Sequence, residues 1–265
     1  MANHRARKRF GQNFLVARPT IEKIISLIDP RPMEKIIEIG PGRGALTLPL
    51  VECGAEVWAI EIDRDLVALL QDITASYDSI HIISGDFLDF EPDPVSLPRF
   101  TLVGNLPYNI TSPVVDWCVH YANRIDQAVF MVQAELADRL SGKPGSKDWS
   151  PLAIFTQKLF DIQHHFRVSP GSFRPSPNVQ SAVVSLTPRD DAELPSPAFE
   201  RVVRSAFKHR RKTLVNNLTA ELVPDSDTAL ALLSEVPLEP KCRAEQVTTE
   251  QFLTLTSLMT ARKLV

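Results

Sequence analysis

Short β-branched runs alternate with helical segments through the first two thirds of this chain. Runs with the length of strands lie at 35–40, 56–61, 81–84, 100–104 and 128–132. Apolar residues at helical spacing occur at 21–28, 45–53, 64–75 and 111–121. This alternation is typical of βαβ units, in which the strands of a sheet run parallel. We therefore expect an α/β domain of the Rossmann-like type with a mostly parallel sheet.

The last third of the chain has a different pattern. Residues 188–197 are rich in proline, aspartate and glutamate, which predicts a linker. Beyond them the spacing of apolar residues is helical, and we expect helices at 199–218, 228–234 and 249–259. The predicted organisation is thus a large domain over 1–187, a linker over 188–197 and a small helical domain over 198–265.

Composition excludes several classes of protein. Of the 265 residues 44% are hydrophobic and the net charge is only -3, which argues against wholesale disorder. No apolar stretch approaches the ~20 residues that a membrane span needs, and no apolar run follows the basic N-terminus as in a secretory signal. The three cysteines are far apart in sequence, so we expect reduced thiols in a cytoplasmic protein and no metal site.

Charge is distributed unevenly along the sequence. Basic residues are concentrated near the two ends, whereas the middle of the chain is acidic. Such a split favours contact of both ends with a polyanion, although an ordinary solvated surface explains the charges equally well.

Three strand ends carry residues suited to a nucleotide-like ligand. Gly40 and Gly42 follow the first strand, and glycines there let the backbone turn sharply in front of a helix N-terminus. Glu61 ends the second strand and is placed to bind ribose hydroxyls. Asp86 and Phe87 follow the third, where a carboxylate and a ring suit an adenine. The pattern alone fits both dinucleotide and methyl-donor sites.

The tetrapeptide from Asn105 to Tyr108 narrows the choice. It directly follows the fourth strand, so it lies at the predicted ligand crevice. The exocyclic nitrogen of adenine is a poor nucleophile because its lone pair is delocalised into the ring. An asparagine oxygen and the Leu106 carbonyl, held by the fixed φ of Pro107, are able to accept both N–H bonds, while the tyrosine stacks on the base. A nicotinamide dehydrogenase leaves this tetrapeptide unexplained.

Motifs along almost the whole chain resemble those of the ribosomal RNA adenine N6-dimethyltransferases. The matching segments are RKRFGQNFL at 7–15, EIGPGRG at 38–44, EID at 61–63, GD at 85–86, GNLPYN at 104–109, FRPSPNV at 173–179, RRKT at 210–213 and RAE at 243–245. The resemblance implies a class I methyltransferase domain that uses S-adenosyl-L-methionine. It also implies that the substrate is a pair of adjacent adenosines near the 3′ end of small-subunit ribosomal RNA, each converted to N6,N6-dimethyladenosine.

The resemblance also implies roles for individual residues. The methyl donor is expected to contact Gln12, Asn13, Leu15, Gly40, Gly42, Glu61, Ile62, Asp86, Phe87 and Asn105. The target adenine is expected to contact Asn105, Leu106, Pro107, Tyr108 and Phe173. RNA phosphates are expected to contact Arg7, Lys8, Arg9, Arg204, Lys208, Arg210, Arg211 and Lys212. Part of this basic set has independent support, because Arg201, Arg204, Lys208 and Arg211 share one face of the helix expected at 199–218.

Some positions that are usually basic in this family are not basic in this chain: Ala134, Pro151, Asn178 and Val215. The changes predict a lower affinity for naked RNA. The expected partner is the small-subunit particle. We expect a monomer. The alternatives are an assembly checkpoint factor that binds with little turnover, a methyltransferase of large-subunit RNA, and, more distantly, a nicotinamide oxidoreductase.

Overall fold

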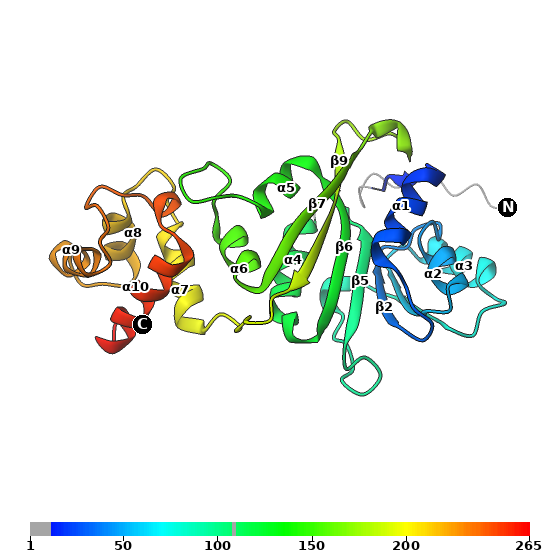
Figure 1. The fold of residues 1–265 in the computed structure, drawn as a ribbon, viewed down its shortest axis with the longest axis horizontal. Helices are drawn as coiled ribbons and strands as arrows, with labels where there is room; N and C mark the ends of the chain where they lie inside the picture. The colour runs from blue at the N-terminus through cyan, green and yellow to red at the C-terminus, as the bar shows by residue number, and fades with distance from the viewer. Residues whose placement is uncertain (1–11, 108–109) are drawn as a thin grey trace. The chain divides into compact units, whose positions relative to one another are not determined.

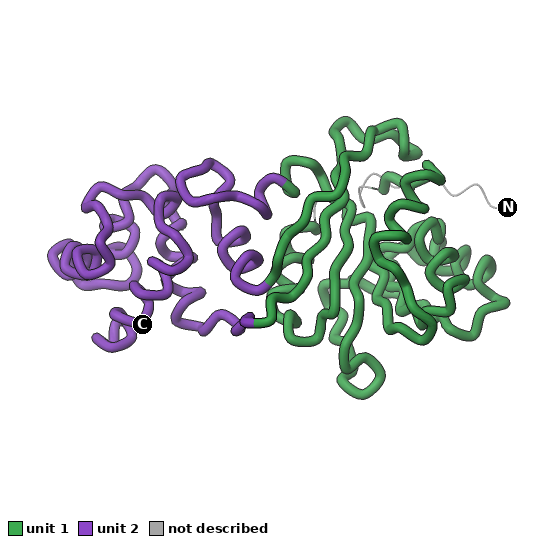
Figure 2. Tube along the Cα trace, in the orientation of Figure 1, with its two compact units in different colours: residues 1–137, 160–190 green, residues 138–159, 191–265 purple. Residues whose placement is uncertain are grey.

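The computed structural model describes residues 12–107 and 110–265. The chain divides into two compact units, coloured separately in Figure 2. The first comprises Met1–Ala137 with Phe160–Asp190, and the second comprises Asp138–Leu159 with Asp191–Val265. No helix within the described ranges is long and apolar enough to cross a membrane.

A seven-stranded sheet forms the centre of the first unit (Figure 1). Its strand order is β4-β3-β2-β5-β6-β9-β7, with β9 antiparallel to both of its neighbours and the first five strands parallel. This confirms the predicted α/β fold with a mostly parallel sheet. The strands are β2 (Lys35–Ile39), β3 (Glu56–Glu61), β4 (Ile80–Ser84), β5 (Phe100–Asn105), β6 (Ile125–Gln133), β7 (Phe160–Val168) and β9 (Ser181–Pro188).

The order of the strands creates a crevice. From β2 the chain proceeds to β3 and β4 on one side, and it continues with β5 and β6 on the other. Ligands of open α/β sheets bind where the order reverses, outside the carboxyl ends of the strands. The connecting helices are α1 (Arg18–Ile28), α2 (Thr47–Glu52), α3 (Arg64–Ile73) and α4 (Thr111–His120). Short 3-10 turns follow β4 (η2, Phe87–Asp89) and α4 (η3, Ala122–Arg124).

The central strands are rich in buried apolar residues, as expected for a parallel sheet with helices on both faces. Ile36, Ile37 and Ile39 of β2 are at most 1% exposed. The strand β9 and its edge partner β7 were not predicted. The β7 sequence mixes histidine, glutamine and arginine with apolar residues, and a bulge interrupts its pairing between His164 and Phe166. This strand therefore lacks the alternation that marks a half-buried strand.

A second, two-stranded sheet lies beside the crevice. It pairs β1 (Phe14–Leu15) with β8 (Phe173–Arg174) antiparallel, so that Leu15 lies opposite Phe173. The 3-10 turn η4 (Pro170–Ser172) precedes β8, and Val16 N–H donates a hydrogen bond to the Ser172 carbonyl at 2.9 Å. The sheet fixes the N-terminal segment next to the main sheet.

The second unit is helical. It contains the end of α5 (Ala134–Leu140), then α6 (Pro151–Leu159), α7 (Pro197–Ala206), α8 (Leu214–Glu221), α9 (Ser226–Glu235), the turn η5 (Ala244–Gln246) and α10 (Thr249–Ala261). Asp138–Leu159 belongs to this unit, so the division differs from the boundary expected at 187. The reason is packing, because Trp149 is 2% exposed and its indole N–H donates to the Val247 carbonyl at 2.8 Å.

The single helix expected at 199–218 is wrong. Helix α7 ends at Ala206, and α8 begins after Thr213, whose hydroxyl accepts a hydrogen bond from Asn216 N–H. The buried Asn217 side chain explains the break. Its amide nitrogen donates to the Ala206 carbonyl at 2.8 Å and the His209 carbonyl at 3.2 Å, and its oxygen accepts from His209 N–H at 3.2 Å. Lys208 and Arg211 therefore do not share a helix face with Arg204.

Replacing Asn217 with alanine is expected to lower the free energy of unfolding of the second unit by about 2–3 kcal/mol. The change removes three hydrogen bonds and leaves the buried Ala206 carbonyl without this partner. Urea unfolding followed by circular dichroism measures the effect. The neighbouring Asn216→Ala is the control, since that side chain is exposed. Equal midpoints for the two variants would contradict the role given to Asn217.

Candidate active site

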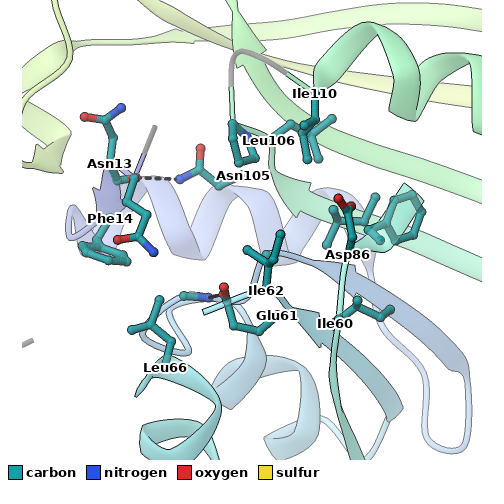
Figure 3. A pocket seen from close by; sticks show the side chains of 17 residues that line it. Asn13, Phe14, Ile60, Glu61, Ile62, Leu66, Asp86, Asn105, Leu106 and Ile110 are labelled. Carbon is teal, nitrogen blue, oxygen red and sulfur yellow. Dashed lines mark hydrogen bonds between the residues drawn. The ribbon is translucent and has the colours of Figure 1, made fainter. Parts of the chain in front are cut away.

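A cavity lies at the carboxyl ends of β2, β3, β4 and β5, beneath the segment that leads into β1 (Figure 3). Residues predicted from five separate parts of the sequence meet in its lining. They are Gln12, Asn13, Gly40, Gly42, Glu61, Ile62, Asp86, Phe87, Asn105, Leu106 and Pro107. Their convergence follows from the parallel strands, which all end at the same edge of the sheet.

The glycine turn after β2 has a backbone that side chains disfavour. Gly40 and Gly42 have φ angles of +62° and +61°. A Cβ atom on Gly42 would lie 3.2 Å from the Phe14 ring, which packs against the turn. Gly40 N–H donates to the Ile60 carbonyl at 3.0 Å and fixes the turn to β3. The turn thus presents bare backbone to the cavity.

Glu61 lies at the end of β3 and is 4% exposed. One carboxylate oxygen accepts a hydrogen bond from Gly42 N–H at 3.0 Å, and the other accepts from Asp63 N–H at 2.9 Å. Burial raises the pKa of this carboxyl, and the two backbone donors act in the opposite direction. Each oxygen retains a lone pair, so the carboxylate is able to accept hydrogen bonds from a diol while it holds the glycine turn.

A second buried carboxyl was not assigned a role from the sequence. Glu38 in β2 is 2% exposed and accepts a hydrogen bond from the Thr47 hydroxyl at 2.6 Å. Burial raises its pKa from the ordinary 4.5 to about 7. Glu38 and Leu15 line a smaller cavity beside the main one. The two cavities have four lining residues in common, which are Phe14, Gly40, Gly42 and Asn105. Only the tertiary structure reveals that this carboxyl is enclosed.

Glu38 makes the stability of the folded chain depend on pH. The folded state keeps this proton up to about pH 7, whereas the unfolded chain loses it near pH 4.5. Its contribution to the free energy of unfolding therefore falls by about 3 kcal/mol as the pH rises between these values. Glu38→Gln removes the titration, so its stability relative to the parent chain is expected to be higher at pH 8 than at pH 5 by that amount.

Urea unfolding at both pH values measures the difference. Glu56→Gln is the matched control on the neighbouring strand, because hydrogen bonding to Lys35 lowers the pKa of the Glu56 carboxyl. A carboxyl with a lowered pKa loses its contribution to stability only as the pH falls below about 4.5, so the stability of Glu56→Gln relative to the parent chain is expected to change little between pH 5 and pH 8. If the free energy of unfolding of Glu38→Gln differs from that of the parent chain by the same amount at both pH values, Glu38 is not protonated in the folded chain.

Asp86 and Phe87 form another wall of the cavity. Asp86 caps the turn η2, with one carboxylate oxygen accepting from Leu88 N–H at 3.0 Å, and the other oxygen remains for a ligand. Phe87 is 3% exposed because it packs on Trp117, with 4.8 Å between the ring centroids. Ile62 is 45% exposed and lines the same cavity. A carboxylate acceptor between apolar walls suits a flat base that carries an amino group.

Asn105 joins β5 to the N-terminal segment. Its amide nitrogen donates to the Asn13 carbonyl at 2.9 Å, drawn as a dashed line in Figure 3. Because a carbonyl only accepts hydrogen bonds, this contact fixes the orientation of the amide and leaves its oxygen as an acceptor. Gly104 permits the close approach of β5 to β2 just before Asn105, since a Cβ atom there would lie 2.9 Å from the Ile39 carbonyl oxygen.

The backbone after Asn105 is held at both ends. Leu106 N–H donates to the Met131 carbonyl at 3.0 Å. The Pro107 carbonyl accepts from Ile110 N–H at 3.1 Å and from the Thr111 hydroxyl at 3.0 Å. No described residue donates a hydrogen bond to the Leu106 carbonyl. The predicted aromatic partner, Tyr108, lies outside the described residues.

Two predicted residues do not line the main cavity. Leu15 is 6% exposed and Phe173 is 1% exposed, and both belong to the hydrophobic core. A ring that is buried in this way has no free face for a base. Phe173 therefore supports the N-terminal segment through the pairing of β8 with β1, and a direct contact with adenine requires the ring to leave this packing.

The predicted RNA-binding residues fall into three groups. Arg7, Lys8 and Arg9 lie outside the described residues. Arg204 lies 3.9 Å from the Glu200 carboxylate, Lys208 pairs with Glu221, and Arg210 lies 3.9 Å from the Glu245 carboxylate. Arg211 and Lys212 are exposed and have no ion-pair partner among the described residues. Surface pairing reduces the positive charge that Arg204, Lys208 and Arg210 offer to a polyanion.

The fold and the site together define a class I S-adenosylmethionine-dependent methyltransferase. The sequence profile of one family, described as Ribosomal RNA adenine dimethylase, matches residues 3–261. The chain belongs to the ribosomal RNA adenine dimethylase family, as the motifs predicted.

Individual relatives agree with this family. A protein of Pseudomonas syringae pv. syringae named Ribosomal RNA small subunit methyltransferase A is 44% identical over 236 residues, which cover 85% of this chain and 86% of that protein. A relative with the same name from Pseudomonas syringae pv. tomato is 40% identical and covers 98% of this chain and 97% of its own length.

Solved structures are also similar. A dimethyladenosine transferase from Plasmodium falciparum has a TM-score of 0.82 at 23% identity, covering 95% of this chain and 98% of its own. The 23S rRNA methyltransferase ErmE has a TM-score of 0.70 at 30% identity, covering 94% and 100%.

Proposed function

We propose that this enzyme transfers methyl groups from S-adenosyl-L-methionine to N6 of two adjacent adenosines near the 3′ end of small-subunit ribosomal RNA. The family and the name of the Pseudomonas relatives support the choice of ribosomal RNA and of its small subunit. The orientation of Asn105 carries the chemistry, because an amide oxygen is left at the cavity as an acceptor.

The residues of the cavity fit the methyl donor. The bare backbone of Gly40 and Gly42 would take the methionine end, Glu61 the ribose and Asp86 the adenine. S-adenosylmethionine, when bound, supplies an electrophilic methyl group on a positively charged sulfur. Glu61 is suited to binding the ribose because its two carboxylate oxygens are already oriented by the backbone N–H groups of Gly42 and Asp63. Gln12 contacts the residue that orients Glu61, since its amide nitrogen donates to the Asp63 carboxylate at 3.1 Å.

The chain acts on the target adenine mainly by positioning. In the proposal the Asn105 oxygen and the Leu106 carbonyl accept the two N–H bonds of the amine and favour a pyramidal nitrogen with an exposed lone pair. The nitrogen becomes more acidic once the new N–C bond forms, so its proton leaves without a strong base. Transfer of a second methyl group requires a site that readmits monomethylated adenine.

The partner in the proposal is the small-subunit particle during its assembly in the cytoplasm, bound by a monomer of this chain. Several positions expected to be basic contribute instead to folding, since Val215 is 7% exposed and Pro151 begins α6. Contacts with ribosomal proteins on the particle would compensate for the lost charges. Binding to naked RNA is then weaker and more sensitive to salt than binding to the particle.

The first experiment is transfer of labelled methyl from S-adenosylmethionine to small subunits that lack the modification. Large subunits and naked small-subunit RNA serve as controls. Label in N6,N6-dimethyladenosine with small subunits alone supports the proposal. Label in large subunits would instead support the activity named for the similar ErmE structure. Tight binding to small subunits without transfer would indicate an assembly factor that has lost turnover.

A further inference from the structure

One loop of the second unit is shaped by backbone contacts and exposes two lysines. Residues 142–148 connect α5 to α6, and Lys143 and Lys147 are both exposed. We call residues 142–148 the α5–α6 loop. Glycine, proline and serine are frequent in it, a composition typical of a flexible loop.

The α5–α6 loop is anchored along its length. The Gln157 amide donates to the Gly142 carbonyl at 2.8 Å, and Gly145 N–H donates to the Glu245 carbonyl. A Cβ atom on Gly142 would lie 2.5 Å from the Asp148 carbonyl oxygen, so only glycine permits the loop to close on itself. Gly145 has a φ of +85°, which side chains disfavour. The two lysines are therefore held on a defined backbone.

Arg210 connects this loop to the turn between α7 and α8. Its guanidinium donates to the Lys147 carbonyl and lies 3.9 Å from the Glu245 carboxylate. Both partners hold the guanidinium against the loop and reduce the charge that it offers to solvent. The next two residues, Arg211 and Lys212, are exposed and unpaired among the described residues. The contact of Arg210 thus joins the start of this basic stretch to Lys147 of the loop.

Exposed basic side chains flank the contact on both segments, Lys143 and Lys147 in the loop and Arg211 and Lys212 directly after Arg210. Arg204 and Lys208 have carboxylate partners in Glu200 and Glu221. Lys143 and Lys147 have no ion-pair partner among the described residues. A fixed cluster of unpaired ammonium and guanidinium groups suits phosphates, which set the affinity and position of a nucleic acid without reading its sequence.

We propose that Lys143 and Lys147 of the α5–α6 loop form, with Arg211 and Lys212, one binding surface for the phosphate backbone of the substrate RNA. Arg210 is a positioning residue that holds the loop beside the turn and makes no phosphate contact of its own. This inference rests on the proposed function, which supplies the RNA. It differs from the sequence prediction, in which Arg210 contacts RNA directly and the loop lysines are not among the RNA-binding residues.

The test uses the full chain with Lys143→Ala and Lys147→Ala combined. Binding to unmodified small subunits and to naked small-subunit RNA is measured at several salt concentrations. The double variant is expected to bind both about 10-fold more weakly at ~0.15 M salt, and the slope of log affinity against log salt should fall by about 1–2. The matched control is Arg262→Ala with Lys263→Ala, which removes the same charge elsewhere on this unit, where Arg262 pairs with Glu235. It should change affinity less than twofold.

Arg210→Ala separates positioning from contact. We expect it to weaken binding as much as the lysine pair does, and to add no further loss when combined with that pair. Arg210→Lys keeps the charge without the planar fork, and its affinity should fall between that of Arg210→Ala and that of the parent chain. Should Arg210→Ala reduce folding in thermal unfolding, the lysine pair carries the test alone, because those side chains are exposed.

A lysine-pair variant with the affinity and salt slope of the parent chain would overturn the proposal. A loss on particles but not on naked RNA would overturn it too, since the surface would then contact a ribosomal protein. Failure of the proposed function is distinguishable from both. In that case the parent chain itself does not bind or methylate small subunits.

Discussion

Replacing Asn105 with alanine is expected to slow methyl transfer by about 1,000-fold while binding to small subunits stays within about threefold. The magnitude corresponds to the loss of one preorganised hydrogen-bonding group at a reacting centre, together with the freedom gained by the N-terminal segment. The amide has both functions, because its nitrogen donates to the Asn13 carbonyl and its oxygen is left as an acceptor on a residue that lines the cavity. Single-turnover transfer from labelled S-adenosylmethionine measures the rate, and filter binding measures retention of the particle.

Two further variants separate those functions. Asn105→Asp restores an oxygen acceptor but cannot donate to the Asn13 carbonyl, so its rate should exceed that of the alanine variant and remain below the parent rate. Thr111→Val is the control in the same backbone segment. It removes one of the two hydrogen bonds to the Pro107 carbonyl, and we expect less than a tenfold effect. An alanine variant within tenfold of the parent rate would exclude Asn105 as a principal holder of the amine.

Replacing Glu61 with alanine is expected to weaken binding of S-adenosylmethionine by about 100-fold, with a smaller effect on the transfer rate at saturating donor. The carboxylate is buried and accepts from Gly42 N–H and Asp63 N–H, so its loss leaves two buried donors unsatisfied. It also removes the proposed acceptor for the ribose. Together these effects correspond to about 3 kcal/mol of binding free energy.

Isothermal titration of S-adenosylmethionine into the purified chain measures this affinity. Glu56→Gln is the control, because Glu56 begins the same strand at the opposite edge of the sheet. Its donor affinity should equal that of the parent chain. Should Glu61→Ala bind the donor normally yet lose transfer, Glu61 would belong to the chemical step rather than to donor binding. The expected result for Glu61→Ala, weakened donor binding with a smaller effect on the transfer rate, contrasts with the loss of transfer expected for Asn105→Ala, so the two variants test each other.

The sequence by itself determined the class of fold and the residues that converge on the cavity. The alternation of strands and helices implied a parallel sheet, and parallel strands place their carboxyl ends at one edge. Gly42, Glu61, Asp86 and Asn105 follow four such strands and therefore meet. The motifs also identified the family, since their order and spacing are local properties of the chain.

Only the tertiary structure decided which charges are free and which groups are buried. Lys208 and Arg210 have the same character in sequence as Arg211, but Glu221 and Glu245 pair with them across the fold. The helix expected at 199–218 is broken because Asn217 satisfies carbonyl and amide groups at the end of α7. Phe173 is buried, and Glu38 is enclosed with a pKa of about 7. Pairing and burial of this kind depend on distant residues, so no local pattern in the sequence encodes them.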